Sequence, residues 1–296
     1  QGQGDELSDL EWDIKSYFIL GGVMHDVAIS VWGIKGWYDY IRPISAIRYF
    51  SEQGQRSDPT LDNYSENGFE LIEGLIEIVE DGDVLAGDNN ENLGKVKLFT
   101  WKGHSYIDDT ESDFAGVDWI LADNWWPYQR PTFVTPNFAG YVSGHSTFSR
   151  AAAEMLENFT GSPYFPGGLE THLAKQKEFL VFEDGPSEDI ELQWVSYKDA
   201  ADQCSLSRIW GGIHPYIDDI PGRLIGQIIG NESFEFGAEY FQNNLSDAEI
   251  QNPSLRLMKN PISNTENIRL INTNGLETFE LYSITGQIVN VTTKFR

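Results

Sequence analysis

The chain has 296 residues, with 46 acidic side chains against 20 Lys and Arg, and a formal net charge of −26 at pH 7. This excess of negative charge argues against nucleic acid or an anionic membrane surface as a partner. The single cysteine, Cys204, excludes an intrachain disulfide and a four-thiolate metal site, and 40% hydrophobic with 13% aromatic residues is typical of a folded globular protein.

The ends and the hydropathy of the chain give two further expectations. No run of eighteen apolar residues is present, so the sequence predicts no membrane-spanning segment. The first residues, Gln1 to Glu6, resemble neither a signal peptide nor a start at an initiator methionine. We therefore expect a mature or trimmed piece of a longer protein.

The first element is a predicted helix over residues 7–32, where apolar side chains keep a helical spacing. Lys35 and Arg42 follow it, seven residues apart, which on one helix would place both cations on the same face two turns apart. Pro43 disfavours helix at Arg42. The pair is either a solvated basic face or, flanked by aromatic residues in so acidic a chain, a site for an anion.

The next stretch gives one predicted helix between two polar loops. Residues 51–64 are a polar loop, and the spacing of Phe69, Ile72, Leu75, Ile76 and Val79 predicts a helix over 69–79. Residues 81–94 form an acidic, Gly- and Asn-rich loop. Its Asp residues miss the spacing of a calcium-binding EF-hand, so calcium is not expected there.

The triplet Ser143-Gly144-His145 stands directly before a strongly periodic helix. Its apolar positions fall at i, i+3, i+4, i+7, i+8 and i+11, namely Phe148, Ala151, Ala152, Met155, Leu156 and Phe159. Unpaired N–H groups and the positive end of the macrodipole at a helix N-terminus suit a tetrahedral oxyanion. Taken alone, the triplet is better interpreted as an ordinary N-cap followed by a first-turn histidine, so the oxyanion site needs support from other motifs.

A second polar group follows a predicted helix over residues 196–209. Arg208 and His214 are separated by Gly211 and Gly212, which indicate a break that lets both side chains face one cavity. Asp218 is then within reach of His214. A carboxylate partner fixes the tautomer of an imidazole and raises its basicity, as a metal ligand or a nucleophile requires.

These three motifs, in this order, resemble the signature of the vanadium-dependent haloperoxidase and type 2 phosphatidic acid phosphatase superfamily. They read Lys35-x6-Arg42-Pro43, Ser143-Gly144-His145 and Ser207-Arg208-x5-His214-x3-Asp218. The flanking sequence resembles the bacterial haloperoxidase branch, so the likeness covers roughly residues 10 to 240. Val142 departs from the pattern, which has Pro before Ser-Gly-His.

The resemblance implies an all-α helical bundle that binds vanadate and uses hydrogen peroxide to oxidise a halide. It implies that His214 coordinates vanadium, that Asp218 supports it, that His145 is the acid–base residue and that Lys35 also polarises the bound peroxide. Phe138 matches a position linked to halide preference. The residues implied to hold the vanadate oxygens are Lys35, Arg42, Ser143, Gly144 and Arg208. An organic acceptor and a homo-oligomer are further expected partners.

Two other functions stay open from the sequence. In an acid phosphatase of the same superfamily, His214 would be the nucleophile that forms a phosphohistidine and His145 would protonate the leaving group. The long gap between Pro43 and Ser143 and the lack of membrane spans favour the haloperoxidase over a lipid phosphatase. A non-catalytic anion-binding surface protein would be favoured only if one motif residue were missing.

The chain changes character near residue 252, where apolar and polar residues alternate and turn formers such as Asn274-Gly275 appear. We expect a helical catalytic domain over residues 1–246, lacking N-terminal helices that its relatives carry, and a β-rich segment over 252–296. The segment is similar to the C-terminal sorting domain of the bacterial type IX secretion system, which implies a secreted or cell-surface protein. It lacks the closing Gly-x-Tyr strand that is usual in such domains, so we expect an incomplete sorting segment.

Overall fold

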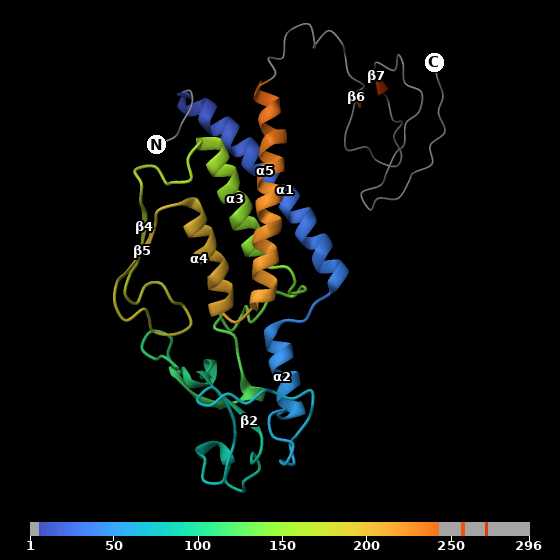
Figure 1. Ribbon diagram of the computed structural model, residues 1–296. Helices are drawn as coiled ribbons and strands as arrows, with labels where there is room; N and C mark the ends of the chain where they lie inside the picture. The colour runs from blue at the N-terminus through green and yellow to red at the C-terminus, as the bar shows by residue number, and fades with distance from the viewer. Residues whose placement is uncertain (1–5, 243–255, 258–269, 272–296) are drawn as a thin grey trace. The chain divides into compact units, whose positions relative to one another are not determined.

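The computed structural model describes residues 6–242, 256–257 and 270–271. Contacts divide the chain into two units, Gln1–Phe241 and Gln242–Arg296. Four helices of the first unit form a bundle (Figure 1): α1 (Asp9–Tyr38), α3 (Gly144–Thr160), α4 (Tyr197–Trp210) and α5 (Tyr216–Gln242). A shorter helix, α2 (Pro43–Gln53), follows α1. The predicted helices over 7–32 and 196–209, and the predicted periodic helix behind Ser143-Gly144-His145, are therefore confirmed.

Helix α1 carries Lys35 at the end of its buried stripe. The helix begins at an N-cap, Ser8, whose side chain accepts a hydrogen bond from the Glu11 N–H, and it ends at Asp39 in the left-handed region with φ 43°. Its buried residues recur every fourth position: Ile19, Val23, Val27, Val31 and Lys35. The apolar members pack against Met155 and Val142, so the hydrophobic core itself fixes where the Lys35 side chain enters the protein.

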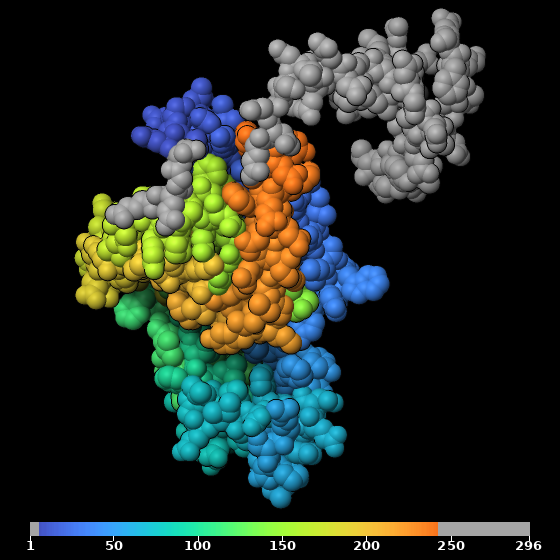
Figure 2. Space-filling model, turned by 45° about the horizontal axis from the view of Figure 1, so that its top comes forward, coloured from blue at the N-terminus to red at the C-terminus, as the bar shows by residue number. Residues whose placement is uncertain are grey.

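Helix α5 packs against α3 through glycines. Gly222, Gly226 and Gly230 lie four residues apart on one face, and a Cβ on Gly226 would come within 2.4 Å of the Thr147 carbonyl oxygen. The absence of side chains lets the two backbones approach closely. Figure 2 shows α5 (orange) lying between α3 (yellow-green) and α1 (blue). This contact holds the first turn of α5 beside the N-terminus of α3.

Substitution of Gly226 by alanine is expected to destabilise the protein by about 1–3 kcal/mol, because the added methyl group overpacks a backbone contact. Gly22, in the middle of α1, has no atom within 4 Å of the place a Cβ would take. Gly22→Ala should therefore be neutral or stabilise by up to about 1 kcal/mol, the helix-propensity gain. Chemical denaturation of both variants checks this, and equal effects would show that the α3–α5 contact is not close-packed.

The segment between α2 and α3 contains a small antiparallel sheet in the order β1-β2-β3. Its strands are β1 (Ile76–Ile78), β2 (Val96–Trp101) and β3 (Val117–Leu121). Short 3-10 turns lie in the two connections, at Val84–Ala86 and His104–Tyr106, and a third follows β3 at Ala122–Asn124. A second pair, β4 (Glu170–Ala174) and β5 (Ile190–Trp194), forms a hairpin between α3 and α4. The architecture is therefore a helical bundle with small sheets, and the expected all-α fold is wrong in this respect.

The predicted helix over residues 69–79 is also wrong. Gly74 has φ 76°, a left-handed value that reverses the chain so that Ile72 pairs with Ile76. Ile76 and Ile78 lie two positions apart in β1, where they pair with Leu98 and Val96 of β2. A short apolar run with β-branched residues is compatible with both the helical and the strand periodicity. The turn at Gly74 reverses the chain, so the residues after it form a strand.

The outer face of α1 is apolar and exposed. The segment Asp9–Gln53 is long and apolar enough to cross a membrane, with mean hydropathy 1.4 over a window that is only 22% buried. Its exposed large side chains include Leu10, Ile14, Tyr17, Phe18, Ile29 and Trp32. Faces of this kind are usually covered by another protein segment. A core helix passes the same hydropathy test, so the absence of a membrane span and the missing N-terminal helices both stay predictions.

The second unit contributes one short antiparallel pair, β6 (Arg256–Leu257) with β7 (Leu270–Ile271). The remaining residues of the expected β-rich segment lie outside the described residues. The domain boundary near residues 246–252 therefore stays a prediction.

Candidate oxyanion site

Lys35 and Arg42 converge on one stretch of backbone, although they do not lie on one helix. The ammonium of Lys35 donates to the carbonyl oxygens of Ala139 and Gly140, each at 2.8 Å. Arg42 stands at the N-cap of α2, directly before Pro43, and donates to the carbonyl oxygens of Phe138 and Ala139. Both side chains are more than nine-tenths buried. The expected convergence of the two cations is confirmed, and Arg42 is not helical, as the following Pro43 predicts.

His214 and Asp218 form the predicted pair. The ring nitrogen Nδ1 of His214 lies 2.7 Å from Oδ2 of Asp218, and the two residues are 5% and 0% exposed. Since a carboxylate accepts, Nδ1 carries the proton and Nε2 keeps its lone pair. A guanidinium nitrogen of Arg42 lies 3.0 Å from Nε2 and donates to it. The nitrogen that a metal or a phosphorus atom would meet is therefore held by a cation.

The turn between Arg208 and His214 requires glycine at position 212 and is crowded at Gly211. Gly212 has φ 71°, and a Cβ there would meet the Trp125 ring at 2.9 Å. A Cβ on Gly211 would lie 2.4 Å from the Gln129 side chain. The turn lets the N–H groups of Ile213 and His214 both donate to the Arg208 carbonyl oxygen. The predicted break at Gly211 and Gly212 is confirmed, and it brings His214 back beside the end of α4.

The triplet Ser143-Gly144-His145 begins α3 as expected. Ser143 is the N-cap, fully buried, and its side chain accepts from the Ser146 N–H. Its own N–H donates to the Asp218 carbonyl oxygen at 2.9 Å. Asp218 thus holds the histidine with its side chain and the N-terminus of α3 with its backbone.

Burial, together with neighbouring charges, lowers the pKa values of Lys35 and of both histidines of the site. Burial, and then the charge of Arg42, lower the pKa of Lys35 to about 8. Desolvation, followed by the nearby charges of Arg208, His214 and Lys35, lowers the pKa of His145 to about 4. His145 is exposed to solvent, so its desolvation is incomplete and the neighbouring positive charges secure the direction. Burial also lowers the pKa of His214. Both histidines are therefore neutral at neutral pH.

Arg208 and Phe138 complete the set of predicted residues. The Nε of Arg208 is buried, and it has no hydrogen-bond partner within the described part of the chain. The Phe138 ring lies 5.3 Å from both the Lys35 ammonium and the Arg42 guanidinium carbon. Phe138 therefore borders the site through cation–π contacts, and Arg208 brings a donor that an oxyanion could satisfy.

Three residues with clear structural contributions were not predicted. A Cβ on Gly140 would lie 3.0 Å from the Ile41 carbonyl oxygen and 3.1 Å from Oδ2 of Asp218, so only glycine fits there without a shift. Ser146 and Asp219 are both buried and hydrogen-bonded to each other beside Ser143. The sequence gives no distinctive spacing for Gly140 or Ser146. For Asp219, the only possible signal was the pair of adjacent acidic residues, Asp218 and Asp219, at the start of a helix.

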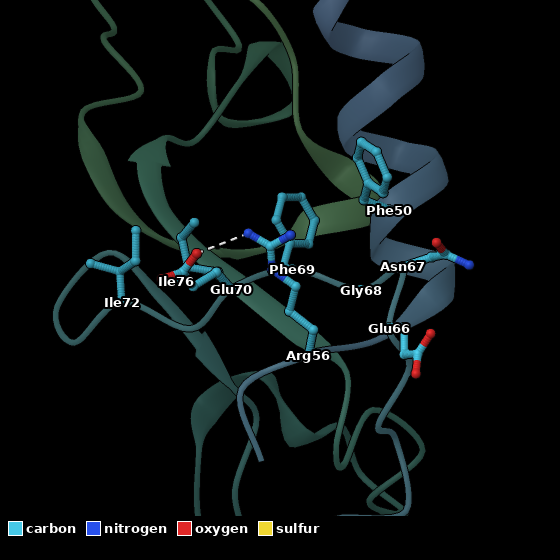
Figure 3. Close-up of a pocket in the computed structure, with 9 residues that line it drawn as sticks. All are labelled: Phe50, Arg56, Glu66, Asn67, Gly68, Phe69, Glu70, Ile72 and Ile76. Atoms are coloured by element: carbon cyan, nitrogen blue, oxygen red, sulfur yellow. Dashed lines mark hydrogen bonds and ion pairs between the residues drawn. The ribbon is translucent and has the colours of Figure 1, made fainter. Parts of the chain in front are cut away.

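A cavity of about 390 Å³ lies elsewhere, between α2 and the loop that leads to β1 (Figure 3). Its lining includes Phe50, Phe69 and the exposed ion pair of Arg56 with Glu70, and none of the predicted site residues. The cations and N–H groups around His214, not this cavity, form the candidate site.

Known proteins share this fold. Residues 90–243 match the family model of the VCPO second helical-bundle domain. An apo-type bacterial vanadium-dependent chloroperoxidase superposes with TM-score 0.58 at 17% identity, covering 82% of this chain and 40% of that one. A holo-type bacterial vanadium-dependent chloroperoxidase gives TM-score 0.52 at 18% identity, covering 75% and 35%. No curated protein matches the sequence.

The fold and these comparisons define a helical-bundle domain similar to those of vanadium haloperoxidases. Because the family model covers more than half of the sequence, the chain belongs to the family of the VCPO second helical-bundle domain. The chain spans well under half the length of both solved structures.

Proposed function

We propose that the protein is a vanadate-dependent haloperoxidase, which uses hydrogen peroxide to oxidise a halide to a hypohalite-type halogenating species. The observation that carries the proposal is the buried pair of Lys35 and Arg42 around His214, whose Nδ1 proton is fixed by Asp218. A negatively charged tetrahedral oxyanion suits this arrangement. The neutral imidazole nitrogen can bind its central atom, and the surrounding cations offset the charge of its oxygens.

The residues present fit vanadate. The Arg208 Nε is a buried donor that lacks a partner among the described residues, and Arg42 occupies the His214 lone pair without forming an ion pair there. An arriving oxyanion can accept from both guanidinium groups, while Arg42 releases Nε2 for the metal. Lys35, Ser143 and the Gly144 N–H at the start of α3 would hold further oxygens.

When bound, vanadate supplies a Lewis acid that makes peroxide electrophilic toward halide. The chain supplies the proton chemistry and the charge. Neutral His145 accepts a proton from incoming peroxide, since its pKa lies well below neutral pH. Lys35 stabilises negative charge on the oxygen next to it, and Asp218 keeps the His214 lone pair directed outward. The Phe138 ring, beside both cations, is the proposed determinant of halide preference.

The alternative is an acid phosphatase of the same superfamily. The hydrogen bond from His214 to Asp218 leaves Nε2 as a nucleophile for phosphorus as readily as a ligand for vanadium. His145 would then protonate the leaving group, yet its lowered pKa makes it a weak source of protons at neutral pH. A bound oxyanion raises this pKa in both reactions, so the likeness of the fold to vanadium-dependent chloroperoxidases is what favours the haloperoxidase.

One assay separates the two activities. Purified protein is given hydrogen peroxide with iodide, bromide or chloride, before and after loading with orthovanadate, beside a phosphate ester. The proposal expects halide oxidation that depends on orthovanadate. Ester hydrolysis that orthovanadate inhibits, without oxidation of any halide, would contradict it and establish the phosphatase.

Oxyanion affinity is expected to fall as the pH rises through about 8, because Lys35 is charged below its pKa of about 8 and neutral above it. Sulfate suits the measurement, since its own charge is constant over this range. Lys35→Met should bind weakly at every pH. Lys15→Met removes a cation that pairs with Glu11 near the other end of the same helix, and it should keep the wild-type profile. A wild-type affinity that is flat from pH 7 to pH 9 would contradict this role of Lys35.

We also propose that the protein is exported to the cell surface or medium. Support comes only from the sequence of residues 252–296, which lie largely outside the described residues. Fractionation of cells that produce the full chain or the chain without residues 252–296 tests this. Equal distribution of the two forms would contradict the sorting role.

A further inference from the structure

A chain of polar groups leads from Ser143 into the protein. The hydroxyl oxygens of Ser143 and Ser146 are 2.9 Å apart, and the Ser146 oxygen lies 2.7 Å from Oδ1 of Asp219. Arg223 donates to both oxygens of Asp219, at 2.9 and 2.8 Å. Ser143, Ser146 and Asp219 are each at least 99% buried. The far end is anchored where Arg223 pairs with Asp202 at 3.0 Å.

The acceptor at one end fixes the direction of these hydrogen bonds. A carboxylate paired with a guanidinium can only accept, so the Ser146 hydroxyl donates its single proton to Asp219. The proton shared by the two hydroxyls must then come from Ser143. The Ser143 oxygen already accepts from the Ser146 N–H, which uses one of its two lone pairs. One lone pair, and no proton, remains for a ligand.

The placement of Asp219 ties this chain to the rest of the site. Asp218 and Asp219 are neighbours in the first turn of α5, so their side chains diverge by about 100° around the helix. Asp218 faces His214, while Asp219 faces Ser146 at the start of α3. The same turn of α5 thus orients the Nε2 lone pair of His214 and the remaining lone pair of Ser143.

We propose that Ser146 and Asp219 are positioning residues that turn Ser143 into a hydrogen-bond acceptor, so that the site selects a tetrahedral oxyanion that carries a proton. The inference rests on the proposed placement of Ser143 in the oxyanion site. An oxyanion with a hydroxyl can donate to Ser143. A fully deprotonated oxyanion would place a lone pair of its oxygen against the lone pair of the Ser143 oxygen. This contact costs free energy because no hydrogen bond forms.

Phosphate and sulfate provide the test, because at neutral pH phosphate carries at least one proton and sulfate carries none. Their affinities for the full chain are measured by calorimetry at one pH and one ionic strength. Wild-type protein should prefer phosphate by about tenfold, the value of one hydrogen bond. In Ser146→Ala, Ser143 regains its proton for the ligand, and the preference should fall to about twofold or less.

Two further variants separate this role from general damage to the fold. Asp219→Ala removes the acceptor of Ser146 and should also lower the preference. Ser149→Ala removes another α3 hydroxyl, bonded to Cys204 instead, and should keep the wild-type ratio. A merely structural role would weaken both anions together and leave their ratio unchanged.

The result that would overturn the inference is equal affinity of wild-type protein for the two anions, no binding of phosphate, or an unchanged ratio in Ser146→Ala. The titration contains no peroxide or halide, so its outcome is independent of the catalytic assay. An altered ratio without halide oxidation keeps this inference and removes the haloperoxidase. Halide oxidation with an unchanged ratio does the reverse.

Discussion

His214→Ala should lose orthovanadate binding by at least about 100-fold and all orthovanadate-dependent halide oxidation with it. Loss of a supporting hydrogen bond alone typically costs 10- to 100-fold in affinity, and this substitution removes the proposed metal ligand itself. It also leaves Asp218 and Arg42 without their shared partner. Binding is measured by calorimetry with orthovanadate, and folding by thermal denaturation.

Two control variants sharpen the test of His214. His172→Ala removes an exposed histidine on β4 and should leave both binding and activity unchanged. Asp218→Asn keeps a side chain of similar shape but can present an amide group to the ring, so affinity should fall by about 10- to 100-fold. Full activity in His214→Ala, with the fold intact, would show that the oxyanion site lies elsewhere.

His145→Ala should keep orthovanadate bound and lose about 10²- to 10⁴-fold in turnover, the usual contribution of general acid–base catalysis. The reason is its protonation state. The pKa of His145 is lowered to about 4, so the imidazole is neutral at neutral pH and can accept a proton. Negative charge from a bound oxyanion raises this pKa, and activity should fall as the pH drops through the raised value.

The matching measurement is the pH dependence of turnover in wild-type protein and in His145→Ala. The variant should lose the acidic limb of the profile together with its rate. His25→Ala is a suitable control, because His25 is exposed on α1 and its side chain lies 3.3 Å from that of its neighbour Asp26, away from the site. An unchanged profile in His145→Ala would remove its acid–base role while leaving the oxyanion site in place.

The helices that hold the site were predictable because each has a strong local signal. α3 has a full apolar stripe behind an N-cap serine, and α4 begins with a capping box formed by Ser196 and Asp199. The His214–Asp218 hydrogen bond was also predictable from local sequence. The two residues are four positions apart where the chain enters a helix, and this spacing brings their side chains together. The roles of these residues in binding and catalysis stay predictions.

The parts that were missed depend on contacts between distant segments. The strands β2 and β3 are separated in the sequence, and no local periodicity predicts that they pair. Lys35 and Arg42 meet because the backbone of residues 138–140 offers carbonyl oxygens to both, not because one helix carries them. Asp219 was overlooked since its partner, Ser146, lies 73 positions away in the sequence.

The central claim is that His214 Nε2 is the attachment point of an oxyanion between Lys35, Arg42 and Arg208. A crystal structure of the protein grown with orthovanadate tests it most directly. The account predicts vanadium within bonding distance of Nε2, with the Arg42 guanidinium moved from that nitrogen onto a vanadate oxygen and Asp218 still on Nδ1. Vanadate bound at another place, such as the cavity beside Arg56, with Arg42 still on His214, would contradict it.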